Sequence, residues 1–557
     1  METIQLFCKN SGKFYDVEPG CSLKEFLAIA GKDIPLNDWL AAYANNQLKE
    51  LRYKLYTNQS IEFIGSDIPD GQKVYSRSLC MLVQKAVNEL WGNEAKLIFD
   101  YSLPMGLYGK IEGRSFTASM KEQLKEKIAS YIKADIPFIK KKLPSKDVIA
   151  LYEKRGQHNK AEICRQIDDF YSTTYWCGDY CDTFYGPLLY SSSCIKAWNI
   201  VEYNEGFCLQ FPLSGSNGEL PHFAYQQKLF NIFEENSQWL RVLGANNIST
   251  INNAILKGYA KSVVAVAEVL HERKYAQIAD MVYQRRDKVK VVLLAGPSSS
   301  GKTTTSLRIA VHLKALGLNP VVIEMDNYFV DRARTPKDEK GEYDFESLYA
   351  MDLKLLNTQL NQLFNGEEIE LPRYDFASGT SQPSGRRIKL KDNDILVMEG
   401  IHALNPELTS GIAPEKKFKV YASALTTLSI DENNYISTSD NRLLRRIVRD
   451  NNFRSYSAEN TILRWKSVRN GEMKNIFPYQ ENADIMFNSS LIYELCLLKY
   501  FAEPQLRKIS KTSAAYPEAN RLLKFLSFVQ ALSPEDHTAI PPTSIMREFI
   551  GGSSFKY

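Results

Sequence analysis

The chain has 557 residues, of which 44% are hydrophobic and 24% are charged, and these ordinary globular values exclude a largely disordered chain. A chain this long exceeds the size of one hydrophobic core, so we expect roughly two to four domains. The 69 basic and 65 acidic residues nearly cancel, which argues against general binding to nucleic acid or membrane.

No apolar run approaches the about 18 residues of a membrane-spanning helix, and the opening Met-Glu-Thr-Ile-Gln is unlike a signal peptide. We therefore expect a cytoplasmic protein without membrane contact. The odd number of cysteines, nine, indicates reduced thiols. For Cys177 and Cys181 a zinc site stays open as the alternative to plain thiols.

Residues 1–66 predict a small β-grasp module. Short alternating runs flank a Pro19-Gly20 turn, Ser22 predicts the cap of a helix over 23–30, and residues 60–64 predict a closing strand. The Gly- and Pro-containing stretch 65–71 predicts a boundary.

Residues 67–240 predict an α+β domain, and 241–288 predict a helical connector. In the α+β domain we expect strands around 96–113 and helices over 78–91, 116–134 and 145–155. In the connector, two apolar stripes at helical spacing predict packing against a neighbour. The members of these stripes are Ile255, Tyr259, Val263, Val266 and Leu270, and then Tyr275, Ile278, Ala279 and Val282.

Residues 289–504 predict a doubly wound α/β domain, and 505–557 predict a helical tail. Near-continuous β-branched runs bounded by polar residues are typical of strands buried on both faces of a parallel sheet. Five such runs alternate with helical segments, at 289–295, 321–325, 395–398, 418–421 and 485–487.

The stretch Gly296-Pro-Ser-Ser-Ser-Gly301-Lys302-Thr303 matches the phosphate-binding loop G-x4-G-K-[ST], between a predicted strand and a predicted helix. Its backbone N–H groups and the helix N-terminus are suited to phosphate oxygens. Lys302 can bridge the transferred phosphate and Thr303 can hold Mg²⁺. The predicted nucleotide-binding residues are Gly296, Ser298, Ser299, Ser300, Gly301, Lys302, Thr303 and Thr304.

Two carboxylates follow strands of the same predicted sheet. Asp326 comes directly after the run 321–325, and Glu399 directly after 395–398. Because ligands bind beyond the carboxyl ends of parallel strands, both side chains should face the phosphate-binding loop. One can help to hold Mg²⁺, while the other accepts a proton from an attacking hydroxyl.

Arginines gather on one predicted helix. Arg442, Arg445, Arg446 and Arg449 lie at i, i+3, i+4 and i+7, on one face, and Arg454 follows. Four guanidinium groups on one face repel each other, which favours a mobile lid that neutralises phosphate during transfer. Binding to an RNA backbone is the competing interpretation.

These motifs, with Met325-Asp326-Asn-Tyr-Phe329, Pro372-Arg-Tyr-Asp-Phe376 and Met398-Glu-Gly-Ile401, resemble the uridine kinase and phosphoribulokinase family. The resemblance covers roughly 289–500 and implies transfer of the γ-phosphate of ATP to a sugar hydroxyl, with Mg²⁺. It implies Asp326 as general base, Thr303, Glu399 and Asp326 at the metal, and Lys302, Arg445 and Arg449 at the phosphates.

The acceptor site departs from the family pattern. In the stretch 345–352, Tyr349 replaces a carboxylate that binds ribose hydroxyls in the family, and the base-reading histidine after Tyr374 is absent. A phenol cannot offer two acceptor oxygens to two hydroxyls. A nucleoside is therefore the default acceptor, with a phosphosugar as the other option. The predicted acceptor-binding residues are Tyr328, Tyr349, Tyr374, Arg442, Arg446 and Arg454.

The N-terminal half resembles the front of threonyl-tRNA synthetase. Residues 1–66 resemble its TGS domain and 67–240 its editing-type second domain, through Phe138–Lys142, Lys154-Arg155-Gly156 and Asp182–Pro187. The four positions equivalent to the editing residues carry Arg77, Met81, Phe184 and Leu188. None of these can perform the hydrolysis, so we expect a non-editing module.

The sequence thus predicts a nucleoside kinase with a regulatory N-terminal half. The alternative is a nucleotide-dependent regulator that binds tRNA or the ribosome, with Lys140, Lys141 and Lys142 as RNA contacts rather than a solvated surface. A homo-oligomer is compatible with both.

Overall fold

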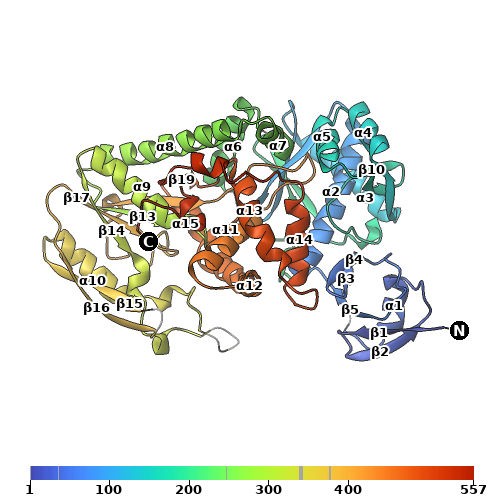
Figure 1. Ribbon diagram of the computed structural model, residues 1–557, viewed down its shortest axis with the longest axis horizontal. Helices are drawn as coiled ribbons and strands as arrows, with labels where there is room; N and C mark the ends of the chain where they lie inside the picture. The colour runs from blue at the N-terminus through green and yellow to red at the C-terminus, as the bar shows by residue number, and fades with distance from the viewer. Residues whose placement is uncertain are drawn as a thin grey trace.

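The computed structural model describes residues 2–35, 37–245, 247–337, 341, 343–375 and 378–556. An N-terminal sheet lies at one end of the elongated molecule and the hairpin β15–β16 near the other, with the C-terminal helices between them (Figure 1). Phe376, the last residue of one predicted motif, lies outside the described residues.

The N-terminal sheet has the order β2-β1-β5-β3-β4, with β1 parallel to β5 and the other neighbours antiparallel. Helix α1 (Leu23–Ala30) has the predicted bounds, because Ser22 and Glu25 form a reciprocal capping box at its start. This topology is the one expected of a β-grasp fold. The strands are β1 (Ile4–Cys8), β2 (Lys13–Val17), β3 (Ala41–Ala44), β4 (Gln47–Glu50) and β5 (Gln59–Ile64).

Helix α2 (Pro69–Trp91) begins earlier than the expected Ser78. Only the last residues of the predicted boundary, Pro69 to Gly71, lie in its first turn, where Pro69 loses no hydrogen bond. A Cβ on Gly71 would lie 1.8 Å from the carbonyl oxygen of Gly65, so the backbone passes very close there.

An antiparallel sheet, β11-β12-β7-β6, and a three-stranded sheet, β10-β9-β8, follow α2. Their strands are β6 (Leu97–Leu103), β7 (Gly106–Ile111), β8 (Phe138–Pro144), β9 (Tyr171–Cys177), β10 (Tyr180–Asp182), β11 (Asn199–Tyr203) and β12 (Gly206–Gln210). Helices α3 (Ala118–Lys133) and α4 (Ser145–Lys154) lie near the expected positions, whereas α5 (His158–Ile167) was not predicted.

The connector contains α6 (Gln227–Val242), α7 (Ile248–Leu256) and α8 (Ala260–Gln284). The second predicted stripe is right: Tyr275, Ile278 and Val282 are fully buried. The first is wrong, because Gly258 has φ +81° and breaks the helix. The helical phase restarts after this break, so Tyr259 of that stripe is 61% exposed.

The five apolar runs of the C-terminal half form one parallel sheet in the order β14-β17-β13-β18-β19, as predicted. Val292 packs with Tyr275 of α8 on one face, and Leu293 packs with Leu356 on the other. The sheet is therefore buried on both faces. Its strands are β13 (Val291–Ala295), β14 (Asn319–Glu324), β17 (Asp394–Glu399), β18 (Lys417–Ser423) and β19 (Ile485–Asn488).

Helices and a hairpin surround this sheet. They are α9 (Lys302–Ala315), α10 (Leu353–Phe364), β15 (Ile369–Asp375), β16 (Thr380–Ile388), α11 (Thr438–Phe453), α12 (Ala458–Asn475), α13 (Glu494–Arg507), α14 (Tyr516–Leu526) and α15 (Arg547–Ile550). The expected boundary at residue 504 falls inside α13.

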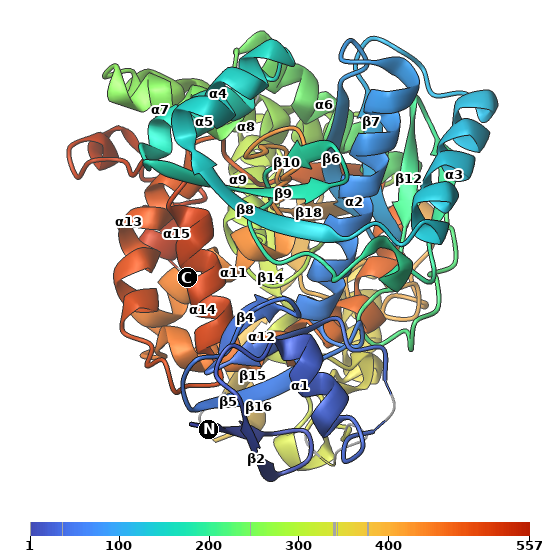
Figure 2. The same ribbon diagram turned by 90° about the vertical axis from the view of Figure 1, so that its right-hand side faces the viewer.

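Helix α14 lies beside β4 of the N-terminal sheet (Figure 2). Nearby, the amide of Asn46 donates hydrogen bonds to the carbonyl oxygens of Lys511 and Ser513 at 3.1 and 3.3 Å. The C-terminal helices thus contact the N-terminal sheet as well as α11.

All nine cysteines are free, and seven are buried. Cys21 and Cys194 are the partly exposed ones. Among the described residues, no helix combines the length and apolar character needed to cross a membrane.

Candidate active site

The loop between β13 and α9 has the geometry of a phosphate cradle. A Cβ on Gly296 would lie 2.0 Å from the carbonyl oxygen of Ala422, so only glycine fits there. Ser299 and Gly301 have φ values of +58° and +78°. Left-handed residues of this kind turn successive N–H groups to one side and create a concave site for anions.

Helix α11 supports the loop from behind. Arg442 donates to the carbonyl oxygen of Ser298 at 3.1 Å, and Arg445 to that of Ser299 at 3.3 Å. Because the C=O and N–H of a peptide group point in opposite directions, anchoring these carbonyls directs the following N–H groups into the cradle.

The hydroxyl groups of Ser299 and Ser300 are buried and, within the described part of the chain, have no hydrogen-bond partner. A buried unsatisfied hydroxyl is costly unless a ligand completes it. Lys302 opens α9 beside these groups. Donors without partners, a helix N-terminus and a lysine fit the phosphates of a nucleotide.

The two predicted carboxylates lie at the carboxyl ends of neighbouring parallel strands. Glu399 ends β17, and Asp326 lies in a short 3₁₀ turn (Met325–Tyr328) after β14. The hydroxyl of Thr303 donates to Oε1 of Glu399 at 2.8 Å. The structure therefore joins the loop threonine to one of the two strand-end carboxylates.

The pKa values of both carboxyl groups are raised above their ordinary values. Burial raises the pKa of Glu399 to about 7; Lys302 lowers it and Asp326 raises it. Asp326 reaches solvent, yet desolvation by the surrounding protein raises its pKa against the opposing charges of Lys302 and Arg454. Two crowded carboxylates beside a hydroxyl are hard oxygen ligands, which fit Mg²⁺.

The arginines of α11 divide into two groups. Arg442 and Arg445 are 1% and 0% exposed and form buried ion pairs with Glu472 of α12 and Glu494 of α13. The expected single exposed face is absent because these two helices supply carboxylates beneath it. Arg442 and Arg445 hold the loop instead of facing solvent.

The other arginines are more accessible. Arg446 donates to Oγ of Ser298 at 2.8 Å, and Arg449 and Arg454 lie near Asp450 at 2.9 and 3.9 Å. The side chain of Arg454 is 54% exposed, and its charge lowers the pKa of Asp326.

The three predicted tyrosines lie in different environments. Tyr328 is 1% exposed and donates to Gln359 at 2.9 Å. Tyr374 is buried, with its ring centroid 5.5 Å from that of Phe329. Tyr349 is 60% exposed and donates to Glu407 at 2.8 Å, so its hydroxyl points to a surface carboxylate.

Sequence reasoning missed Glu346. Burial and Glu472 raise the pKa of its carboxyl to about 7, with Arg446, Lys302 and Asp326 also acting on it. It is therefore a further acidic group close enough to Lys302 and Asp326 to interact with both. Its place in the stretch 345–352, one residue after Phe345, was the available signal.

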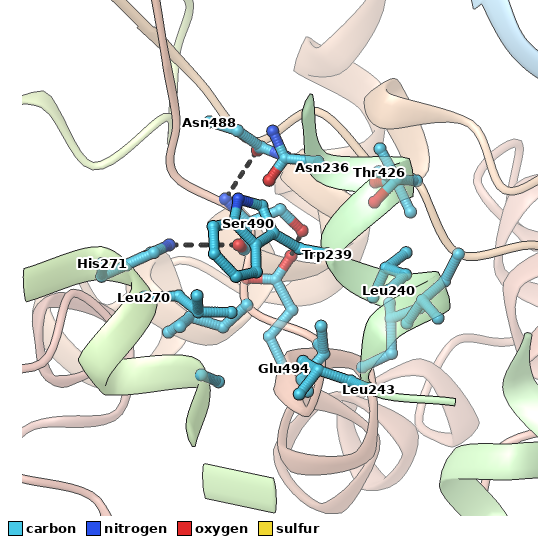
Figure 3. Close-up of a pocket in the computed structure, with 16 residues that line it drawn as sticks. Asn236, Trp239, Leu240, Leu243, Leu270, His271, Thr426, Asn488, Ser490 and Glu494 are labelled. Atoms are coloured by element: carbon cyan, nitrogen blue, oxygen red, sulfur yellow. Dashed lines mark hydrogen bonds between the residues drawn. The ribbon is translucent and has the colours of Figure 1, made fainter. Parts of the chain in front are cut away.

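Figure 3 shows a separate cavity beyond β18 and β19, covered by α6 and α8. Nε2 of His271 lies 3.1 Å from the carbonyl oxygen of Ser490 there. The cavity has a volume of about 50 Å³. That volume suits a few water molecules rather than a nucleoside.

The strand register keeps Cys177 and Cys181 apart. Cys177 is opposite Tyr180, and Cys181 is opposite Trp176, so the two thiols lie on opposite faces of the sheet. Within the described ranges, no group of three or more His, Cys, Asp or Glu side chains is arranged to hold a metal ion. The two side chains therefore do not converge on one site within this pair of strands.

The fold and this site define a P-loop phosphotransferase. Residues 291–492 match the Phosphoribulokinase / Uridine kinase family. Over 198 residues the chain is 31% identical to a uridine kinase of Staphylococcus aureus, spanning 35% of this chain and 86% of the relative. The chain belongs to this family, through its C-terminal half.

Two solved structures also align with this region. One, described as "a Possible Uridine Kinase from Bacillus stearothermophilus", is 22% identical with a TM-score of 0.24, covering 36% of this chain and 88% of its own. A D-glycerate 3-kinase from Cryptococcus neoformans is 13% identical with a TM-score of 0.21, covering 46% and 87%. Membership of the family supports an ATP-dependent kinase that phosphorylates a hydroxyl group of a small molecule.

Proposed function

We propose that the protein transfers the γ-phosphate of Mg·ATP to a hydroxyl group of a nucleoside of the uridine or cytidine kind. The observation that carries this proposal is the position of Asp326 and Glu399 at adjacent strand ends, facing Lys302 and Thr303. An acceptor hydroxyl gives up its proton as it is phosphorylated, and a carboxylate at this strand end can accept that proton.

In the proposed reaction, Asp326 takes the proton of the acceptor hydroxyl while that oxygen bonds to the γ-phosphorus. The bond from the γ-phosphorus to its bridging oxygen breaks, and ADP leaves. Glu346 accepts a hydrogen bond from a second acceptor hydroxyl. Lys302 and the N-terminus of α9 offset the charge on the phosphate oxygens.

Mg²⁺, when bound, supplies charge neutralisation between the phosphates, and Thr303, Glu399 and Asp326 would hold it. Arg446, Arg449 and Arg454 are the proposed neutralising arginines. Arg442, which we expected at the acceptor, and Arg445, which we expected at the phosphates, become positioning residues because their guanidinium groups are already paired in the core.

We also propose that the N-terminal half is a non-editing regulatory unit, with a TGS-like first part and a synthetase-like second part. The mixed sheet order of β1–β5 supports the first likeness. At the editing positions, Met81, Phe184 and Leu188 pack in one apolar core, and Arg77 donates to the carbonyl of Pro187. Such a core contains no group for ester hydrolysis.

The alternative, an RNA-binding regulator, gains no support from the lysine run. Lys140 pairs with Glu50 at 3.4 Å, and Lys141 lies 4.3 Å from the centroid of the Trp176 ring. These contacts within the protein compete with binding to phosphates at Lys140 and Lys141.

An acceptor screen tests the proposal. The purified protein is incubated with Mg·ATP and single nucleosides or phosphosugars, and ADP and the phosphorylated product are measured together. We expect acceptor-dependent ADP release with a nucleoside. ATP binding without transfer to any acceptor, together with RNA that co-purifies through moderate salt, would favour the RNA-binding alternative.

A further inference from the structure

The C-terminal segment 540–552 packs directly on the phosphate-binding loop. Ile545, Met546 and Phe549 are almost completely buried. A Cβ on Gly301 would lie 2.2 Å from Cδ1 of Ile545. In addition, Arg308 of α9 donates to the carbonyl oxygen of Thr543 at 2.8 Å.

Within this segment, the carboxylate of Glu548 sits at the first turn of α9. Its Oε2 accepts a hydrogen bond from the hydroxyl of Thr304 at 2.7 Å and from the N–H of Thr304 at 3.3 Å. The first N–H groups of a helix have no partner within the helix. In a phosphate-binding loop these are the groups that receive phosphate oxygens. A carboxylate there presents the same kind of anionic acceptor.

The negative charge of Glu548 prevents a phosphate from using the same hydrogen-bond donors. The Glu548 carboxylate also contributes to the raised pKa of Glu399, so its charge reaches the proposed metal side of the cleft. A phosphate that used the N–H of Thr304 would meet a fixed negative charge at hydrogen-bond distance. Two anions cannot share one set of donors without repulsion.

We propose that Glu548 is a built-in competitor of the donor nucleotide: it occupies a phosphate position in the loop, and ATP binds only as the Glu548 carboxylate leaves. This inference rests on the proposed function, because it takes the loop to be the ATP site. The C-terminal segment then acts as an internal restraint on donor binding.

ATP binding without acceptor tests the restraint. Dissociation constants for Mg·ATP are measured by calorimetry for the full chain and for Glu548→Ala and Glu548→Gln, with Lys302→Ala as the loop control. Glu535→Gln, on an exposed residue of the same tail, is the matched control. We expect Glu548→Ala to bind ATP about tenfold more tightly, since a charge-assisted hydrogen bond no longer competes.

The Gln variant should tighten binding less than Ala, because its amide oxygen can still accept from Thr304. Without nucleotide, Glu548→Ala should unfold at a lower temperature than the wild type, so ATP affinity and stability move in opposite directions. If Glu548 had only a structural role, its replacement by Ala would lower both the ATP affinity and the unfolding temperature. If Glu548→Ala fails to fold, Glu548→Gln decides.

Two further outcomes separate this inference from the proposed function. In the first, the wild type binds ATP and phosphorylates an acceptor, but the folded Glu548 variants bind ATP no more tightly than the wild type. This result overturns the proposed restraint and leaves the proposed kinase activity standing. Folded wild type and Glu548 variants that all fail to bind ATP overturn both.

Discussion

Asp326 carries the proposed proton transfer, so its replacement separates chemistry from binding. Asp326→Asn keeps the shape but cannot accept a proton, and we expect kcat to fall by about 10²- to 10⁴-fold. The affinity for Mg·ATP should fall far less than kcat, because the loop, Thr303 and Glu399 remain to hold the phosphates and the metal ion. Steady-state kinetics and calorimetry check this, with Asp392→Asn in an exposed turn as control. An equal loss in both variants would contradict the assignment.

The pH profile gives a second test at the same residue. Desolvation raises the pKa of Asp326, and the base works only when deprotonated. Activity should therefore fall as pH drops through this raised pKa, at a higher pH than the about 4 of a free aspartate. If kcat/KM fell on acidification only at the pH expected of a free carboxylate, the result would contradict the role of Asp326 as the base.

The raised pKa of Glu399 predicts that this residue destabilises the metal-free protein at high pH. Its pKa is raised from 4.5 to about 7 in the folded state, so the stability it contributes is present at low pH and lost as pH rises through 7. In metal-free protein at pH 8, Glu399→Gln should raise the unfolding free energy by about 2–3 kcal/mol. Near pH 4 the gain should vanish.

Chemical denaturation at both pH values measures this effect. Added Mg²⁺ should stabilise the wild type and not the Gln variant, because the variant lacks a charged ligand. A variant that Mg²⁺ stabilises as much as the wild type would remove Glu399 from the metal site.

At the scale of elements, the loop that leads into α11 is anchored in the N-terminal half. Lys160 and Asp182 form a fully buried ion pair with contacts of 2.7 and 2.9 Å. Asn433 of this loop donates to the same Asp182 carboxylate, and Phe99 donates to the carbonyl of Glu432 at 2.9 Å. The helix that supports the phosphate-binding loop is thus attached to a distant part of the chain.

Breaking this pair should destabilise the whole protein. Lys160→Met leaves the buried charge of Asp182 without its partner, and we expect a loss of about 3–5 kcal/mol in unfolding free energy. The double variant with Asp182→Asn should recover part of this loss. Lys154→Met, on an exposed lysine of α4, is the control. Additive losses in the double variant would show that the two residues act independently.

Elements with a continuous physical signal were predictable from the sequence. The five parallel strands followed from apolar runs, and α1 followed from its capping box. The early start of α2 was missed because Pro and Gly ordinarily mark a boundary, whereas here Gly71 permits close contact with Gly65. The break at Gly258 was missed because both apolar stripes keep helical spacing.

The part of the candidate site that is marked by local sequence signals was also predictable. The loop, Asp326 and Glu399 are marked by local motifs at strand ends. The partners Glu472 and Glu548 are not. Glu472 accepts a hydrogen bond from the N–H of Ser298, 174 residues away, and Glu548 one from the N–H of Thr304, 244 residues away. The arginine spacing predicted one exposed face, whereas the tertiary packing buries Arg442 and Arg445 against Glu472 and Glu494.

At the scale of the whole molecule, Arg521 of α14 joins three regions. It donates to both oxygens of Asp440 on α11 at 2.7 Å and to Glu518, and Lys73 of α2 lies 3.6 Å from Glu518. Arg521 and Lys73 outweigh the burial of Glu518 and hold its pKa below the ordinary range. Arg521 and Glu518 together therefore connect the N-terminal half, the loop-supporting helix and the tail.

Arg521→Gln should lower the unfolding free energy by about 1–3 kcal/mol at pH 7, with partial exposure of the pair limiting the loss. Because the Glu518 pKa is depressed, its stabilisation is present above about pH 4.5 and is lost on acidification. The variant should therefore approach the wild type at low pH. Arg507→Gln, which breaks an exposed helical pair, should cost under about 1 kcal/mol.

The buried cysteines are spread over several regions of the protein, so their reactivity can be used to follow local unfolding in each region. Burial raises the pKa of the Cys177 and Cys496 thiols to about 11 and 12, so both resist alkylation while their surroundings stay closed. Cys8 lies in the N-terminal sheet, Cys177 in the second region and Cys496 in α13. A brief pulse of alkylating reagent, read by mass spectrometry, would time the opening of each region without any engineered label.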